Sequence, residues 1–288
     1  MVYKLLVTNI DGTLLQDNGR MNKVTREAIE FAQNKDITVL LTTSKHYSAA
    51  KRIAKALNIE GHIIAHQGAF IGKEVNKPVY VRRITPQITK EIVALLETVP
   101  CHFKLVHEEY TIANKVKLPD SLLARVVFQR TSRFSYSEQF VDDVSEKLQE
   151  TSVSPPNIEV TFENKSYLED AQKALTAMFD EVVCIPTDSH SMQIVSSDVS
   201  KLNGVQYVCS QMGIRPSEVV AIGSGMDDLS LVKWAGLGVA MGNAPQEVKA
   251  VANWLTRSNN DNGVAYMVKE HFRKQYKLEF LRKIDMLK

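Results

Sequence analysis

The amino-acid sequence predicts an α/β fold, with a Rossmann-like core built on a parallel sheet and interrupted by an inserted α+β domain. Strand-like and helix-like segments alternate from the N-terminus to about residue 83, the order expected of parallel strands covered by helices. Between residues 84 and 188 the segments group differently, and the alternation resumes near Met192. We therefore expect a core domain of residues 1–83 and 189–288, and an inserted domain of residues 84–188.

The first part of the chain predicts three short buried strands separated by two helices. The first helix is expected over residues 24–34, with Asn22 as its N-cap and with Val24, Ala28 and Phe31 on its inner face. Apolar runs bounded by polar residues predict the strands, which are residues 4–8, 37–41 and 62–65.

The inserted segment and the return to the core are predicted from similar signals. Helices are expected over residues 86–97 and 166–179, separated by several strand-like runs, a mixture typical of an α+β domain. Beyond the insert, Ser200 is expected to cap a helix that Gly213 ends. That helix should carry its inward side chains at Val205, Val208 and Met212.

Composition narrows the class of protein. The 288 residues carry a formal net charge of only +2, and 44% of them are hydrophobic, so neither nucleic acid nor membrane is indicated as a partner. No apolar run is long enough to span a bilayer, and the N-terminus does not resemble a signal peptide. The three cysteines are odd in number and far apart, which favours a reduced cytoplasmic protein over a disulfide framework.

Polar residues gather where the predicted strands end. In an open parallel sheet, ligands bind at the carboxyl ends of the strands. Loops leave predicted strands there at residues 9–14 (N-I-D-G-T-L), 42–45 (T-T-S-K) and 223–228 (G-S-G-M-D-D), and Lys201 begins a helix nearby. Each feature alone is typical of a turn, a helix cap or a solvated charge. Their common position at one edge of one sheet predicts a functional site.

These segments resemble the motifs of the haloacid dehalogenase superfamily, and more narrowly of its Cof-type branch, whose members carry an α+β cap. Residues 8–14 (T-N-I-D-G-T-L) are similar to the family's D-x-D-G-T-L, and residues 223–228 to its G-D-G-x-N-D. The resemblance covers the chain to about residue 265. The other similar segments are residues 41–45 (L-T-T-S-K, for L-A-T-G-R), 67–69 (Q-G-A, for N-G-A), 200–201 (S-K), 238–244 and 262–265.

The resemblance implies hydrolysis of phosphomonoesters of small metabolites, such as sugar phosphates or phosphorylated cofactors. In the family the first Asp of D-x-D attacks phosphorus, and Asn9 holds that position here. The second Asp, Asp11, would act as general acid and base. The implied Mg²⁺ ligands are at the positions of Asn9, Asp11, Ser224 and Asp228. The implied contacts to the phosphoryl group are at Ile10, Thr43, Ser44, Lys201 and Asp227.

Several of these positions depart from the family's pattern. Asn9 replaces the nucleophilic Asp, Ser224 replaces a metal-binding Asp, and Asp227 replaces an Asn that donates to phosphate. Mg²⁺ is usually held by one or two carboxylates, so the predicted metal site is weak or absent. Two hypotheses for Asp227 remain: it takes over cation binding from Ser224, or the metal is no longer needed. Ser44 and Lys45 replace Gly and Arg, which keeps a positive charge.

Two functions stay open from the sequence. In the favoured one, the protein binds a small phosphorylated or anionic ligand with little or no turnover. In the alternative, it is a slow Mg²⁺-dependent phosphomonoesterase in which Asp11 is the base for direct attack by water. A histidine base at His46, His66 or His190 is a second source of activated water, but packing or surface positions are more typical of such residues.

The C-terminal segment, residues 272–288, is predicted to form a basic helix. Leu278, Leu281 and Ile284 are at helical spacing, and Arg and Lys residues fill the other positions. We expect this helix to dock on the core with its basic face in solvent. A role in contacting a protein partner is the alternative.

Overall fold

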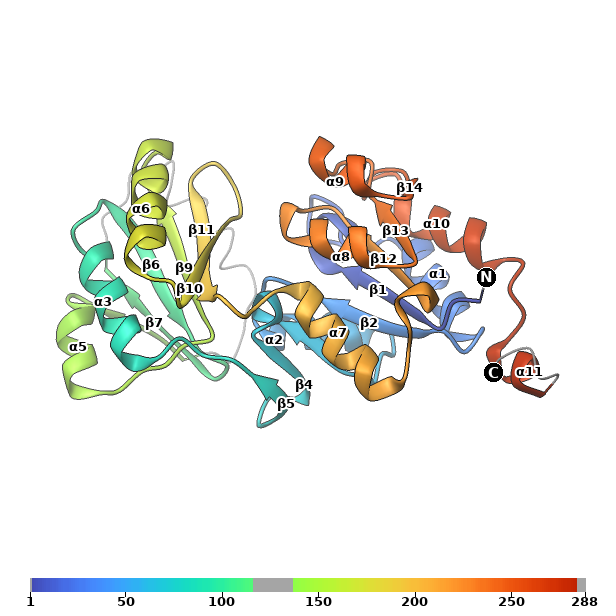
Figure 1. The fold of residues 1–288 in the computed structure, drawn as a ribbon, viewed down its shortest axis with the longest axis horizontal. Coiled ribbons are helices and arrows are strands. Elements are labelled where there is room, and N and C mark those ends of the chain that lie inside the picture. The colour runs from blue at the N-terminus through green and yellow to red at the C-terminus, as the bar shows by residue number, and fades with distance from the viewer. Residues whose placement is uncertain (1, 116–136, 284–288) are drawn as a thin grey trace. The chain divides into compact units, whose positions relative to one another are not determined.

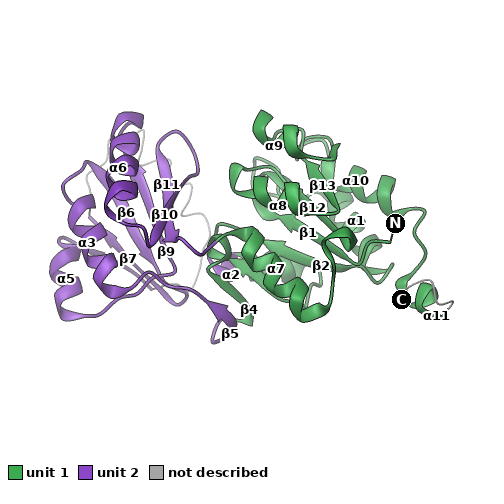
Figure 2. Ribbon diagram, in the orientation of Figure 1, with its two compact units in different colours: residues 1–45, 50–74, 200–288 green, residues 46–49, 75–199 purple. Residues whose placement is uncertain are grey.

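The computed structural model of the protein describes residues 2–115 and 137–283. The chain divides into two compact units (Figure 2). The first comprises residues 1–45, 50–74 and 200–288, and the second comprises residues 46–49 and 75–199.

The first unit is built on a mostly parallel sheet with β1 near its middle (Figure 1). β1 pairs in parallel with β2, where Asn9 lies beside Thr42, and with β12, where Thr8 lies beside Ile222. Because these strands run in the same direction, the loops that follow them leave the sheet at one edge. In order across the sheet, the strands of this unit are β14 (Trp254–Leu255), β13 (Leu237–Ala240), β12 (Val219–Gly223), β1 (Leu5–Asn9), β2 (Thr38–Thr42), β3 (Ile63–Ala65) and β4 (Phe70–Glu74).

Helices connect these strands and pack beside them. α1 packs against α10, and α8 packs against both α7 and α9. Single helical turns follow β3 at η2 (His66–Gly68) and β12 at η4 (Met226–Asp228), and another, η3 (Pro216–Glu218), precedes β12. The helices are α1 (Lys23–Gln33), α2 (Tyr47–Ala56), α7 (Lys201–Met212), α8 (Leu229–Trp234), α9 (Gln246–Val251), α10 (Gly263–Phe272) and α11 (Leu278–Lys283).

The predicted caps are confirmed. The Asn22 side chain accepts a hydrogen bond from the backbone N–H of Val24, and the Ser200 side chain accepts one from Asn203. Gly213 ends α7 with a φ of 63°, a left-handed conformation that glycine adopts without strain.

The inner faces of two helices differ from the prediction. In α1 the buried residues are Thr25, Ala28, Ile29 and Ala32, so the helix is turned by about one position and Phe31 is exposed. In α7 the buried stripe ends at Cys209, and Met212 is exposed in the last turn. In both helices two neighbouring rows of residues have the spacing of an apolar face. Only packing against the sheet decides which row is buried.

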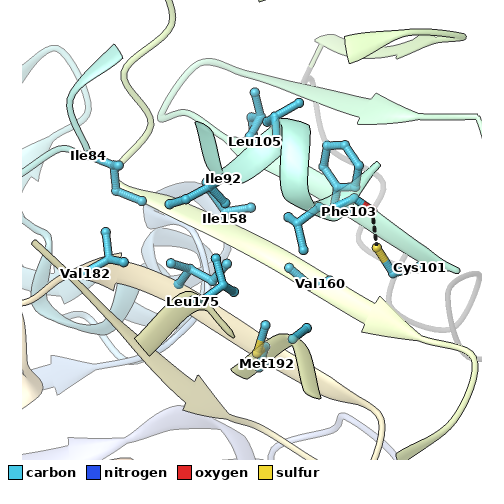
Figure 3. Close-up of a cluster of buried hydrophobic side chains, with 14 of the residues drawn as sticks. Ile84, Ile92, Cys101, Phe103, Leu105, Ile158, Val160, Leu175, Val182 and Met192 are labelled. Carbon is cyan, nitrogen blue, oxygen red and sulfur yellow. Dashed lines mark hydrogen bonds between the residues drawn. The ribbon is translucent and has the colours of Figure 1, made fainter. Parts of the chain in front are cut away.

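The second unit contains a mainly antiparallel sheet with helices α3 (Pro86–Leu96), α5 (Val144–Glu150) and α6 (Lys165–Met178). Its core joins side chains such as Phe103, Leu105, Ile158 and Leu175 (Figure 3). β5 (Lys77–Val81) lies at the start of this unit. Across its sheet the strands are β10 (Val182–Pro186), β11 (Ser191–Ser196), β9 (Asn157–Phe162), β6 (Cys101–Val106), β7 (Tyr110–Asn114) and β8 (Ser137–Val141).

The predicted fold class, a parallel-sheet core with an inserted α+β unit, is therefore confirmed. One segment lies elsewhere than the sequence analysis placed it. β11, within residues 189–288 assigned to the core, pairs with β9 and β10 of the second sheet. The first unit resumes only at Ser200. The apolar alternation near Met192 is thus that of the last strand of the insert.

The C-terminal segment is not one helix from residue 272 onward. α10 ends at Phe272, a bend follows, and α11 begins at Leu278; residues 284–288, with Ile284, lie outside the described part of the chain. The segment docks on the first unit: Leu278 and Leu281 are buried, and the Lys35 Nζ donates to the Gln275 carbonyl oxygen at 2.5 Å. Across residues 2–115 and 137–283, no helix has the length and apolar character that a membrane span requires.

Candidate active site

The loop after β1 places Asn9 at the middle of the candidate site. Asn9 is the last residue of β1 and its side chain is buried. Its Oδ1 accepts a hydrogen bond from the backbone N–H of Ile10 at 2.8 Å. Its Nδ2 donates to the Asp11 carbonyl oxygen at 3.3 Å and to Asp228 Oδ2 at 3.0 Å. The Asn9 amide therefore uses both its oxygen and its nitrogen in holding the loops together.

The Asp11 carboxylate is held at one oxygen. Lys45 Nζ lies 2.6 Å from Asp11 Oδ1, and both side chains are about half exposed. Asp11 Oδ2 makes no hydrogen bond with any described residue, although this atom is shielded from solvent. The adjoining Gly12 has a φ of 64°, and a Cβ on it would lie 2.9 Å from Ser224 Oγ, so glycine fits this turn on both counts. Asp11 thus presents one unpaired oxygen at the carboxyl end of β1.

The loop after β2 presents hydroxyl groups and a helix start. Thr43 is fully buried, and its Oγ1 accepts a hydrogen bond from the backbone N–H of Lys45 at 3.1 Å. The Thr43 carbonyl oxygen accepts from the backbone N–H of Gln67 at 3.2 Å, which ties this loop to the turn after β3. Ser44 is half-buried between these residues.

The loop after β12 closes on the first loop through Ser224. Ser224 Oγ donates to the Asp11 carbonyl oxygen at 3.2 Å and accepts from Thr13 Oγ1 at 3.0 Å. The backbone N–H groups of Ser224 and Gly225 both donate to Asp228 Oδ2, at 2.9 and 3.0 Å. Ser224 therefore acts here as a hydrogen-bonding link between loops.

Lys201 lies among carboxylates at the base of the site. Its side chain is only 1% exposed, and its Nζ lies 2.7 Å from both Asp227 Oδ2 and Asp228 Oδ1. Burial lowers the pKa of Lys201, but the two carboxylates outweigh it and the pKa is raised. Burial likewise raises the pKa of Asp227, yet Lys201 and a hydrogen bond from Gln67 bring it below its usual value. Burial, together with the charge of Asp227, raises the pKa of Asp228.

The structure thus brings together the predicted residues Asn9, Asp11, Ser224, Asp227 and Asp228, with Lys201 in contact with the last two. Two contributors were not among the predicted site residues. These are Gln67, which bonds Asp227, and Asn243, whose Nδ2 donates to the Gly12 carbonyl oxygen at 2.9 Å. Both lie in segments that resemble the family, residues 67–69 and 238–244, so that similarity was the available signal.

The three histidines considered from the sequence are divided between the two units. His66 is buried after β3, where its backbone N–H donates to the Lys45 carbonyl oxygen and its ring packs edge-on to Phe70. His46 and His190 belong to the second unit. A histidine-activated water has no support in these contacts.

The residues at the predicted metal position do not fit Mg²⁺. Asn9 Oδ1 is a neutral amide oxygen that already accepts one hydrogen bond from the Ile10 N–H, and the Asp11 carbonyl oxygen already accepts two, from Asn9 and Ser224. Within residues 2–115 and 137–283, no three His, Cys, Asp or Glu side chains gather as a metal-binding group. A hard cation needs oxygen ligands, and here the Asn9 Nδ2 group donates its hydrogens to the Asp11 carbonyl oxygen and to Asp228 Oδ2.

Comparison with known proteins agrees with this architecture. A family model for haloacid dehalogenase-like hydrolases matches residues 6–268. The stress response protein YhaX of Bacillus subtilis is 41% identical over 286 residues, which are 99% of each chain. The putative phosphatase YxeH of the same organism is 29% identical over 283 residues, covering 93% of this chain and 98% of that protein.

Solved structures share the fold. A haloacid dehalogenase-like hydrolase from B. subtilis superimposes with a TM-score of 0.81 at 22% identity, covering 93% of this chain and 99% of that one. Because the motifs, the family model and the relatives agree, the predicted resemblance is confirmed: the chain belongs to the haloacid dehalogenase-like hydrolase family, with Cof-type phosphatases among its relatives.

Proposed function

We propose that the protein is a non-hydrolytic member of this family that binds a small phosphorylated metabolite. The observation that carries the proposal is the hydrogen bond from Asn9 Nδ2 to Asp228 Oδ2, at 3.0 Å. A carboxylate cannot donate this bond, so the contact depends on the neutral amide at the position where the family attacks phosphorus.

The chemistry lost by this exchange is large. An amide oxygen is a poor nucleophile, and Asn9 Oδ1 moreover already accepts a hydrogen bond from the Ile10 N–H. Loss of the attacking residue in covalent mechanisms lowers turnover by on the order of 10⁶-fold. Binding of a phosphorylated ligand does not need that residue, and the name of the relative YxeH as a putative phosphatase supports this ligand class.

The two lysines of the site differ in their availability to a phosphoryl group. Lys201 is fully buried between two carboxylates, whereas Lys45 forms a half-exposed ion pair with Asp11. An exposed ion pair contributes only about 0–1 kcal/mol, so Lys45 can exchange Asp11 for a ligand at little cost. We propose that Lys45 contacts the phosphoryl group, with Lys201 as internal support.

A phosphatase assay on the purified full chain tests the proposal. We expect a panel of sugar phosphates and phosphorylated cofactors to be hydrolysed no faster than in buffer, with or without Mg²⁺. The triple variant Asn9→Asp, Ser224→Asp, Asp227→Asn should gain Mg²⁺-dependent turnover, and adding Asp11→Asn should remove it. Rapid hydrolysis of any monoester by the wild type would contradict the proposal. Equilibrium binding of the same panel to wild type and Lys45→Ala measures the retained recognition.

One observation favours slow phosphomonoesterase activity as a second candidate. Asp11 Oδ2 has no hydrogen-bond partner among the described residues, while Lys45 fixes the other oxygen. An oriented carboxylate with a free oxygen suits a general base that activates water. Under this alternative a small wild-type rate would disappear in Asp11→Asn and persist in Asn9→Ala.

Two further sequence predictions remain part of the proposal. We propose a cytoplasmic location, which the three free cysteines support because disulfides are rare in reducing compartments.

A protein contact through the basic C-terminal segment, residues 272–288, is also proposed. The exposed side chains of Tyr276 and Phe280 support it: their rings lie 5.5 Å apart at an angle of 47°, and aromatic residues are enriched at interfaces.

A further inference from the structure

Lys201 is a buried ammonium group that lies between two carboxylates. An ammonium group buried in a protein interior needs nearby opposite charge, because removing it from water costs several kcal/mol. Lys201 Nζ has two such partners at 2.7 Å, one oxygen from Asp227 and one from Asp228. The site therefore already contains a cation between carboxylates.

The remaining oxygen of Asp228 is also fully used. Asp228 Oδ2 accepts three hydrogen bonds, from Asn9 Nδ2 and from the backbone N–H groups of Ser224 and Gly225. A carboxylate oxygen offers about two lone-pair directions, so three donors leave no room for a metal ion. A divalent cation would have to displace Lys201 or these donors.

The charges of Lys201, Asp227 and Asp228 explain why an aspartate at position 227 is compatible with neutral residues at positions 9 and 224. Lys201 carries +1 and the two aspartates −2, which leaves one negative charge that Asn9 and the loop amides solvate. Aspartates at positions 9 and 224 would add two more negative charges within the same hydrogen-bonded cluster. Such a cluster would repel itself unless a multivalent cation entered it.

We propose that the Lys201–Asp227–Asp228 ion triplet replaces a divalent metal as the cation that ties the start of α7 to the loop after β12 and, through Asp228, to the loop after β1. Asp227 completes the triplet, and Asn9 and Ser224 supply neutral hydrogen-bond donors at the positions where anionic ligands would require a metal. This inference concerns what holds the loops together, so it does not depend on whether turnover remains.

Metal-dependent stability of the full chain tests the triplet. We expect the Tm of the wild type to be the same in EDTA and in millimolar Mg²⁺, and Mn²⁺ to keep its free signal in electron paramagnetic resonance. The double variant Asn9→Asp, Ser224→Asp should have a lower Tm in EDTA and regain several degrees in Mg²⁺, because a ligand that binds only the folded state stabilises it. A wild-type Tm that rises with Mg²⁺, or wild-type binding of Mn²⁺, would overturn the proposal.

A second variant keeps the test decisive if the double variant does not fold. Asp227→Asn leaves Lys201 buried with one carboxylate and should lower the Tm by several degrees, equally in EDTA and in Mg²⁺. The matched control is Asp142→Asn, which removes one carboxylate from the exposed ion pair with Lys115 and should leave the Tm near that of the wild type. Equal Tm values for Asp227→Asn and the wild type would sink the inference.

This outcome is independent of the phosphatase assay. Metal-free hydrolysis by the wild type would contradict the proposed function and leave the triplet intact. Tight Mg²⁺ binding without hydrolysis would contradict the triplet and leave the proposed function intact.

Discussion

Asn9 holds the candidate site through both ends of its amide group. Its oxygen faces the Ile10 N–H, and its nitrogen faces Asp228 Oδ2 and the Asp11 carbonyl oxygen. The contact partners on the nitrogen side are all acceptors. Acceptors at this position stabilise an amide, which donates to them, and would repel a carboxylate of the same shape.

The isosteric change Asn9→Asp should therefore destabilise the protein in the absence of metal. It replaces a donor by an anion 3.0 Å from Asp228 Oδ2, and leaving buried polar groups unpaired costs about 1–3 kcal/mol. Urea unfolding in EDTA measures the loss. The same change at exposed Asn18 is the control and should have little effect; equal stability of Asn9→Asp and the wild type would show that the amide is not required.

Glu218 links the N-terminal strand to the loop before β12 and makes stability depend on pH. Burial alone would raise its pKa, but hydrogen bonds from Lys4 and from Arg215 lower the pKa from 4.5 to about 2. A carboxyl group with a lowered folded-state pKa stabilises the protein above its unfolded pKa, and this contribution is lost as the pH falls from about 4.5 to about 2.

We expect Glu218→Gln to lower the free energy of unfolding by about 1–3 kcal/mol at neutral pH, as for a hydrogen-bonded, poorly exposed carboxylate. The difference from the wild type should shrink as the pH falls from about 4.5 towards 2, because the Glu218 carboxylate is progressively protonated over this range. Urea titrations across this range test it, with exposed Glu60→Gln as the control. A difference that stays constant with pH would exclude the ion pair as its cause.

At the scale of elements, the turn after β3 and the start of α7 determine each other's position. Gly68 has a φ of 105°, and a Cβ on it would lie 2.2 Å from the carbonyl oxygen of Ser200, the N-cap of α7. Lys201 is the next residue, so this contact sets the depth at which its ammonium enters the site. The turn residue thus positions a charged group that is distant in sequence.

Gly68→Ala should consequently destabilise the chain by about 1–3 kcal/mol, since overpacking forces backbone shifts and the φ is unfavourable for a side chain. Thermal unfolding measures this effect. Gly61→Ala is the matched control because a Cβ there meets no atom within 4 Å. If both variants unfold at the same temperature, the close approach of Gly68 to Ser200 does not contribute to stability.

At the scale of the whole molecule, each unit has a sheet and a buried core of its own. The core of the second unit, with Phe103 and Ile158, is drawn from residues between 84 and 194. This segment is nearly continuous in the chain, whereas the first unit is assembled from both ends. A continuous segment with its own core has the properties of an independently folding domain.

The fragment 75–199 should therefore fold alone, with a cooperative urea transition followed by circular dichroism. In the full chain, Phe103→Ala should lower the free energy of unfolding of this unit by about 3–5 kcal/mol. The urea midpoint of the transition that belongs to this unit should fall accordingly. A fragment without a cooperative transition would mean that the insert depends on the first unit for its fold.

The sequence alone determined the α/β class, the inserted unit, the helix caps at Asn22 and Ser200, and the family. These features follow from local periodicity, cap chemistry and motif spacing, which act within a few neighbouring residues. It also located the exchanged positions Asn9, Ser224 and Asp227, because a motif fixes residue type and order.

The tertiary structure decided what those residues contact. No local rule shows that Asp227 pairs with Lys201, that Asn9 donates to Asp228, or that β11 joins the second sheet rather than the first. These contacts join residues that are far apart in sequence, and they are selected by the packing of loops and strands whose ends meet only in the folded chain.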